Sequence, residues 1–183
     1  MQSHIRVAAL LGLAFVLAGA RPALYADTKS PVEEIRKELM QLPYYSVFDY
    51  LAFSYDRGTV TLMGYAYHLG LKQDAVRAAK RAPGVDQVID KIEELPVSQF
   101  DDELRYRIAR SIYNNSNFWN YAIMPNPPIH IVVEHGRVTL TGVVQSNVDR
   151  MLARSLATQF GALSVTNALK TDAEIGDNVA KSE

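Results

Sequence analysis

The amino-acid sequence contains one pattern twice, and this repeat limits the folds that the chain can adopt. Residues 58–64 read Gly-Thr-Val-Thr-Leu-Met-Gly, and residues 136–142 read Gly-Arg-Val-Thr-Leu-Thr-Gly, 78 positions later. Further apolar residues match at offsets of 78 and 77: Leu51, Phe53 and Tyr55 with Ile129, Ile131 and Val133, and residues 88–92 with residues 165–169. Three matched blocks in the same order predict two copies of one domain, at residues 30–96 and 98–170.

Each copy is expected to begin with an amphipathic helix. In the first copy, Ser30, Pro31 and Glu33 supply an N-cap residue, a proline at the first helical position and a glutamate at the third. In the second copy, acidic residues follow at 101–103, where the helix dipole favours negative charge. Each helix precedes an alternating apolar run, residues 51–55 or 129–133, which is typical of a half-buried strand.

Glycines predict where the chain turns within each copy. The Arg-Gly pair at 57–58 and the His-Gly pair at 135–136 predict tight hairpin turns, because glycine readily adopts a positive φ. Gly64 and Gly142, at the end of the repeated pattern, are expected to end or bulge the second strand.

A second helix and a third strand complete each copy. The helix is expected near residues 71–82 and again from Ser146, and a glycine follows it in both copies. The order is therefore α-β-β-α-β in about 65–70 residues. The residues that mark the helix end and the last strand are Gly84 and Val88 in the first copy and Gly161 and Val165 in the second. The apolar residues of the second copy's helix are Val148, Met151, Leu152, Leu156 and Phe160.

This arrangement resembles the BON domain (bacterial OsmY and nodulation), with its Gly-x-Val-x-Leu-x-Gly segment, an amphipathic helix, and Val-x-Asn/Asp-x-Leu/Ile. The resemblance covers nearly all of the chain after residue 30. The first copy has Asp90 for the usual Asn, and residues 160–163 depart from the usual Gly-Val. The matching residues are Gly58, Val60, Leu62, Gly64, Gly84, Val85, Val88, Asp90 and Ile92, and then Gly136, Val138, Leu140, Gly142, Gly161, Val165, Asn167 and Leu169.

The resemblance implies a fold and a general role. The fold is α+β, with two tandem α-β-β-α-β units, each a small three-stranded mixed sheet with two helices on one face. The role is that of a non-enzymatic envelope module that binds phospholipid or belongs to envelope assemblies. Paired copies of this kind resemble osmotically induced periplasmic proteins.

The first 26 residues are expected to be a signal peptide. Residues 7–20 form a 14-residue apolar stretch without charge, after His4 and Arg6 and before small residues. Cleavage is expected after Ala20 or Ala26. Arg21 interrupts the stretch before the roughly 20 apolar residues of a membrane span, so no transmembrane segment is expected in the mature chain. These features predict export, with the bacterial periplasm as the compartment.

Composition excludes several classes of protein. The chain has no cysteine, which excludes a disulfide scaffold, a thiolate zinc site, a thiol nucleophile and an acylated-cysteine lipoprotein. Its net charge of −1 excludes a generic polybasic nucleic-acid binder. No nucleic acid is therefore expected among the partners.

No group of residues predicts catalysis or a cofactor. His130 and His135 are five residues apart, so on a regular strand they point to opposite faces, and His68 lies in the other copy. The sequence has no Gly-x-Ser-x-Gly segment and no phosphate-binding loop. We therefore expect a protein without enzymatic activity, metal or cofactor.

Aromatic residues gather after the first helix of each copy. Two interpretations remain open: they fill each small core or pack one copy on the other, or they form a belt that touches a membrane or partner. The residues are Tyr44, Tyr45, Phe48 and Tyr50, and then Tyr113, Phe118, Trp119 and Tyr121.

Charge favours the second copy as the binding copy. Residues 30–97 have a net charge of −2, residues 98–170 of +2, and residues 171–183, expected to be a disordered acidic tail, of −3. Arginines next to aromatic residues suit an anionic lipid head group; the alternative is a solvated helix face on which Glu103 pairs with Arg107. The predicted lipid or partner site is Arg105, Arg107, Arg110, Phe118, Trp119 and Tyr121.

The sequence thus predicts an exported binding module of the envelope that contacts anionic phospholipid and serves in envelope stress protection. The alternative is a periplasmic protein–protein adaptor or a chaperone-like stress protein. The sheet face away from the helices is mildly apolar, which suits packing between the two domains or onto a partner strand. Its residues are Ala52, Ser54, Thr61 and Met63 in the first copy and His130, Val132, Thr139 and Thr141 in the second.

Overall fold

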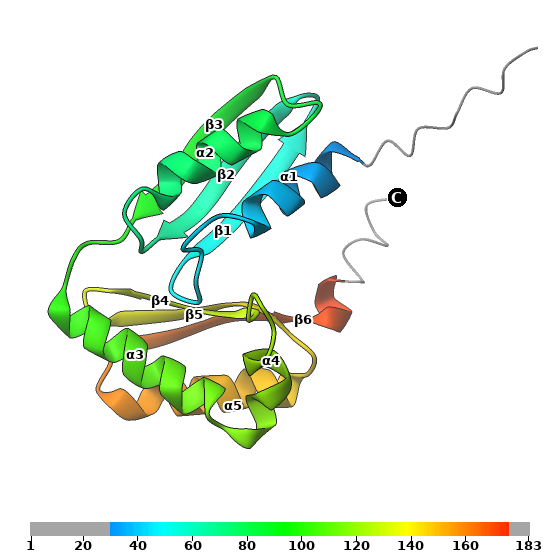
Figure 1. Ribbon diagram of the computed structural model, residues 1–183. Coiled ribbons are helices and arrows are strands. Elements are labelled where there is room, and N and C mark those ends of the chain that lie inside the picture. The colour runs from blue at the N-terminus through cyan, green and yellow to red at the C-terminus, as the bar shows by residue number, and fades with distance from the viewer. Residues whose placement is uncertain (1–29, 176–183) are drawn as a thin grey trace, which may run out of the picture.

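Two domains of the same topology follow one another along the chain (Figure 1). The computed structural model describes residues 30–175, apart from the side chain of Gln159. The predicted signal peptide, residues 1–26, and residues 176–183 of the predicted tail lie outside the described residues.

Domain 1 is a three-stranded sheet with two helices. Strand β2 is central, antiparallel to β1 and parallel to β3, and α1 and α2 pack on one another. The sheet is therefore mixed, as the family resemblance implies. The elements are α1 (Pro31–Met40), β1 (Tyr50–Asp56), β2 (Thr59–Ala66), α2 (Leu71–Arg81) and β3 (Gln87–Glu94).

Domain 2 repeats this plan and adds one short α-helix and two 3₁₀ helices, Ser116–Phe118 and Thr158–Phe160. Strand β5 lies between antiparallel β4 and parallel β6, and α3 and α5 cover the face of the sheet that points away from domain 1 (Figure 1). The added α-helix, α4 (Trp119–Ala122), lies between α3 and β4. The other elements are α3 (Gln99–Tyr113), β4 (Ile129–Glu134), β5 (Arg137–Val144), α5 (Asn147–Ala157) and β6 (Ser164–Thr171).

Serine caps fix the start of three of the long helices. Ser30 and Glu33 form the predicted capping box of α1, with both hydrogen bonds at 3.3 Å. Ser98 and Ser146 accept from the backbone N–H three residues later in α3 and α5. Each cap satisfies donors that the first helical turn leaves without partners, so the amphipathic faces begin in the correct register.

The two hairpins confirm the predicted turns. Both turn residues have a positive φ in each hairpin, 42° and 85° at Arg57 and Gly58, and 50° and 74° at His135 and Gly136. This is the type I′ geometry that matches the twist of the flanking strands.

The second glycine of each pattern does not end its strand. Gly64 and Gly142 lie inside β2 and β5, which continue for two more residues. At Gly142 the backbone has a φ of 115°, and a Cβ there would overlap the carbonyl oxygen of Pro128. At Gly64, with a φ of 126°, the overlap would be with the carbonyl oxygen of Tyr50. The repeated pattern therefore ends in glycine because two backbones meet there.

A loop of domain 1 completes the core of domain 2. This docking loop, residues 44–49, is the part next to β1 of the segment that joins α1 to β1. Phe48 is 8% exposed and belongs to the core cluster of domain 2, with its ring 5.6 Å from Tyr67 and 5.1 Å from Tyr106. The backbone N–H of Ile131 in β4 donates to the carbonyl oxygen of Val47 at 2.7 Å. The two domains thus share packing and a strand-edge hydrogen bond.

The open face of domain 2's sheet lies toward domain 1 (Figure 1). Val132 and Thr141 on this face are buried, and the ring of His130 lies 5.5 Å from that of Tyr45 and 5.7 Å from that of Tyr50. The expectation that this face packs between the domains is confirmed for the second copy.

Domain 2 extends past the predicted end at residue 170. Strand β6 continues to Thr171, and residues 172–175 are helical. The carboxylate of Glu174 accepts from Arg150 and from the N–H of Thr171, each at 2.9 Å. The expectation of a disordered tail from residue 171 is therefore wrong for residues 171–175, because these contacts hold them on the domain.

The close approach at Gly142 leads to a stability prediction. Gly142→Ala is expected to lower the free energy of unfolding by roughly 3 kcal/mol, through backbone strain and the clash with Pro128. Gly161→Ala, also at a positive φ but with open space around it, is expected to cost about 1 kcal/mol. Urea denaturation followed by circular dichroism measures both, and equal losses would contradict the steric explanation.

Candidate functional site

Asp49 fixes the conformation of the docking loop. Its carboxylate is fully buried and accepts hydrogen bonds from the backbone N–H groups of Tyr67 and His68, at 2.7 and 3.1 Å. It also accepts from the N–H and the hydroxyl of Ser46, at 3.0 and 2.8 Å, and lies 2.9 Å from Nδ1 of His68. These contacts satisfy a charge that would be costly to bury alone. They hold the loop in shape against the segment that follows β2.

Arg105, predicted as a lipid-binding residue, is fully buried at the joint between the domains. Its guanidinium donates to the carboxylate of Asp102 at 2.5 Å and to the carbonyl oxygen of Val133 in β4. It also lies 4.7 Å from the centre of the Tyr67 ring. Burial raises the pKa of Tyr67 to about 12, with help from a hydrogen bond to Tyr106, so the ring is neutral beside the cation. Arg105 therefore has no exposed charge for a lipid head group.

Phe118 and Tyr121 are also buried, below the surface that they were predicted to form. The Tyr121 hydroxyl accepts from the N–H of Gln145 at 2.8 Å and donates to Asp149 at 3.0 Å. Burial raises the pKa of Tyr121. These two side chains attach α4 to the core and to the start of α5, so they position the surface around them.

Three predicted residues are exposed on domain 2. Trp119 is 66% exposed at the start of α4. Arg107 and Arg110 lie on the outer side of α3. Arg107 pairs with Glu103 at 3.2 Å, as the solvated-face alternative predicts, whereas Arg110 has no ion pair within residues 30–175. Three of the six predicted site residues are thus at the surface.

Further apolar side chains lie at the same end of domain 2. The last turn of α3, the short α4 and the first turns of α5 meet there (Figure 1). We name this surface the α4 end, and its residues are Trp119, Ile123, Val148 and Met151, each more than 60% exposed. Exposed apolar residues in such a group mark interaction surfaces.

Sequence reasoning missed three of these four residues. Val148 and Met151 were predicted only as apolar residues of this helix, and the stripe that faces the core is built on Ala153 and Ala157. The alanine positions were the available signal, because 153 and 157 are one helical turn apart and out of phase with 148 and 151. Ile123 follows a helix that the sequence did not predict.

The described residues show neither a metal centre nor a membrane span. In residues 30–175, no group of three or more His, Cys, Asp or Glu side chains has the geometry to hold a metal ion. Within the same range, every helix is too short or too polar to cross a bilayer.

Comparison with known proteins identifies the domain type. The BON domain profile matches residues 52–96 and 101–173. No curated protein matches the chain.

Two solved structures are similar to the chain, with low TM-scores and low sequence identity. CdsD, a structural protein of the type III secretion system of Chlamydia trachomatis, has a TM-score of 0.30 and 13% identity, over 83% of this chain and 98% of that one. The C-terminal domain of CdsD has a TM-score of 0.29 and 13% identity, over 78% of this chain and 98% of that one.

The buried arginine leads to a second stability prediction. Asp102→Asn leaves the Arg105 cation buried without a charged partner, and is expected to lower the free energy of unfolding by about 3 kcal/mol. This is the lower end for a broken buried pair, because the Asp102 side chain is 32% exposed. Glu103→Gln breaks a neighbouring exposed pair and is expected to cost less than about 0.5 kcal/mol. Chemical denaturation of the full chain distinguishes the two, and a small loss in Asp102→Asn would contradict the role of the pair.

His130 leads to a pH prediction. Burial lowers its pKa below 6.5, against smaller opposing effects of the backbone of Asp49 and Ser46 and of the Asp49 charge. The unfolded chain therefore binds a proton more readily, so stability is full above pH 6.5 and falls as the pH drops through the folded-state pKa. The rings of Tyr45 and Tyr50 also face the His130 ring. Burial raises the pKa of Tyr45 to about 12, so its hydroxyl keeps its proton over this range.

The measurement is the unfolding free energy at about pH 8 and about pH 5. Wild type is expected to lose more stability between these values than His130→Gln. His68→Gln is the matched control, because it removes the other histidine at the joint between the domains and keeps His130. An equal loss in wild type and His130→Gln would show that another group is responsible.

Proposed function

Because the chain belongs to the BON-domain family, we propose that it is an exported binding module of the bacterial envelope that contacts anionic phospholipid at a membrane surface. BON domains are in general non-catalytic modules associated with membrane or phospholipid interaction. The α4 end of domain 2 is the contact surface of this proposal. The proposal includes export of the mature chain to the periplasm, which the predicted signal peptide supports, and a role in envelope stress protection.

The observation that carries the proposal is the exposure of four apolar side chains at the α4 end. Trp119 begins α4 and Ile123 caps its C-terminal end, one turn later, and Val148 and Met151 are three positions apart on α5. All four expose more than 60% of their surface. A tryptophan among aliphatic side chains suits the boundary between lipid head groups and acyl chains, because its ring has an apolar body and a polar N–H.

Exposed arginines lie on the two long helices that reach the α4 end. Arg110 is in the last turn of α3, Arg107 one turn earlier, and Arg154 one turn after Met151 on α5, all exposed. Each basic residue near an anionic membrane contributes about 1 kcal/mol. The net charge of +2 over residues 98–170, against −2 over residues 30–97, also favours the second domain as the one that approaches an anionic surface.

An adaptor function has its own supporting observation. A cavity of about 470 Å³ lies where the domains join, and its lining is mainly aromatic and apolar, with His68 and Asp102 as further members. Leu69 and Val97 at its rim are 91% and 92% exposed, and Tyr44 is 78% exposed. These side chains suit an apolar segment of a partner protein.

Flotation with phosphatidylglycerol vesicles tests the membrane proposal. The mature chain is expected to float with these vesicles at low salt and to dissociate as salt screens the charges. Arg107→Gln with Arg110→Gln is expected to weaken binding roughly 30-fold, the equivalent of about 1 kcal/mol for each arginine. Trp119→Ser is expected to weaken binding at all salt concentrations.

The control is Arg57→Gln with Lys80→Gln, which removes two exposed cations from domain 1. It is expected to bind like wild type. Absence of flotation at low salt would reject the membrane proposal, and crosslinking to a discrete protein through residues near Leu69 and Val97 would favour the adaptor.

A further inference from the structure

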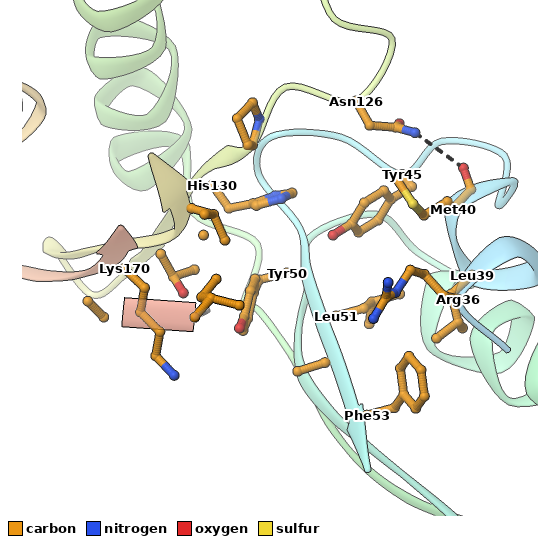
Figure 2. A pocket seen from close by; sticks show the side chains of 17 residues that line it. Arg36, Leu39, Met40, Tyr45, Tyr50, Leu51, Phe53, Asn126, His130 and Lys170 are labelled. Atoms are coloured by element: carbon orange, nitrogen blue, oxygen red, sulfur yellow. Dashed lines mark hydrogen bonds between the residues drawn. The ribbon is translucent and has the colours of Figure 1, made fainter. Parts of the chain in front are cut away.

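A cavity of about 870 Å³ lies between the two domains. Figure 2 shows α1 and β1 of domain 1 on one side and strands of domain 2 on the other. Its volume is within the roughly 300–1,000 Å³ that is usual for small-molecule sites. None of the α4-end residues lines it, so it is a separate place on the molecule.

The wall from domain 2 is the open face of its sheet. His130 pairs with Thr141 across β4 and β5, and Thr141 with Ala168 across β5 and β6. Val143 and Lys170 are the next pair along the same face. Side chains on one face of a sheet repeat every second residue, so these residues form a continuous floor from β4 to β6.

The wall from domain 1 is mainly apolar. Leu39 and Met40 at the end of α1 contribute to it, and Leu51 and Phe53 of β1 continue it. Over the whole cavity, apolar lining exceeds polar lining. Such a surface favours a ligand with an extended apolar part.

The charged side chains that line the cavity are all positive. Arg36 and Lys170 line it, and its lining contains neither Asp nor Glu. Figure 2 shows these two cations on opposite walls, one from each domain. Neither has an ion pair within the described part of the chain. The cavity therefore favours an anion.

The edge of β1 argues against a peptide as the occupant. A peptide that adds to a sheet needs the free N–H and C=O groups of an edge strand. At Leu51 this edge is already covered by the side chain of Tyr45, whose hydroxyl lies by the backbone N–H of Leu51. Burial raises the pKa of Tyr45 to about 12, so the hydroxyl keeps its proton. A hydrocarbon chain needs no free N–H or C=O groups and packs directly against the apolar wall.

We propose that the interdomain cavity binds one long-chain fatty-acid anion. Its hydrocarbon chain lies against Leu51, Phe53 and the floor around Ala168. Its carboxylate lies between the two walls that carry Arg36 and Lys170. The ligand touches both domains and stabilises their mutual arrangement. This site is independent of the proposed vesicle contact, because the two use different residues.

Isothermal titration calorimetry with oleate, below its micelle concentration, tests the proposal on the mature chain. One oleate is expected to bind per chain, and oleyl alcohol, which lacks the charge, is expected to bind at least about tenfold more weakly. Arg36→Gln and Lys170→Gln are each expected to weaken oleate binding about fivefold. Lys80→Gln, which removes an exposed lysine outside the cavity lining, is the matched control and is expected to bind as wild type does.

Ala168→Trp separates this proposal from the membrane contact. Ala168 is exposed on β6 and lines the cavity, so an indole there is expected to fill the space and abolish oleate binding. The same variant is expected to float with vesicles as wild type does, while Trp119→Ser keeps its oleate binding. Absence of oleate binding, or equal binding in Ala168→Trp, would overturn the proposal. Tighter binding of lysophosphatidylglycerol or of an acidic peptide, in competition with oleate, would overturn the assignment of the ligand.

Discussion

Phe48 is part of domain 1 by sequence and part of domain 2 by packing, and most of the interdomain structure depends on it. The docking loop brings this ring between Tyr67 and Tyr106 and adds the Val47 carbonyl to the edge of β4. Asp49 holds the loop by accepting from backbone groups on the other side of β1 and β2. The position of the domains then follows, and with it the burial of Arg105 and the cavity over the sheet of domain 2.

Local features of the fold were predictable from the sequence because they depend on neighbouring residues. The capping box at Ser30, the cap at Ser146 and the type I′ hairpins require only short-range chemistry. The repeat added the order of elements. The role of Gly142 was not predictable at this level, because it depends on the approach of the Pro128 backbone, which lies immediately before β4.

The candidate site was predictable only in part, for a related reason. Arg105 and Arg107 are neighbours in sequence, but one faces domain 1 and is buried while the other faces water. A helix periodicity shows which residues share a face, and it does not show which face a second domain covers. Phe118 and Trp119 differ in the same way, with one ring in the core and the next exposed.

The docking loop also makes the two copies of the repeat unequal. In domain 1, the segment between the first helix and the first strand reaches out to the next domain. In domain 2, the equivalent segment contains Phe118 and Tyr121, which fold back onto their own core. A tandem array grows only if each unit offers the same contact to the next one. Here the second unit has used that contact on itself, so domain 2 does not present the kind of docking loop that it receives from domain 1.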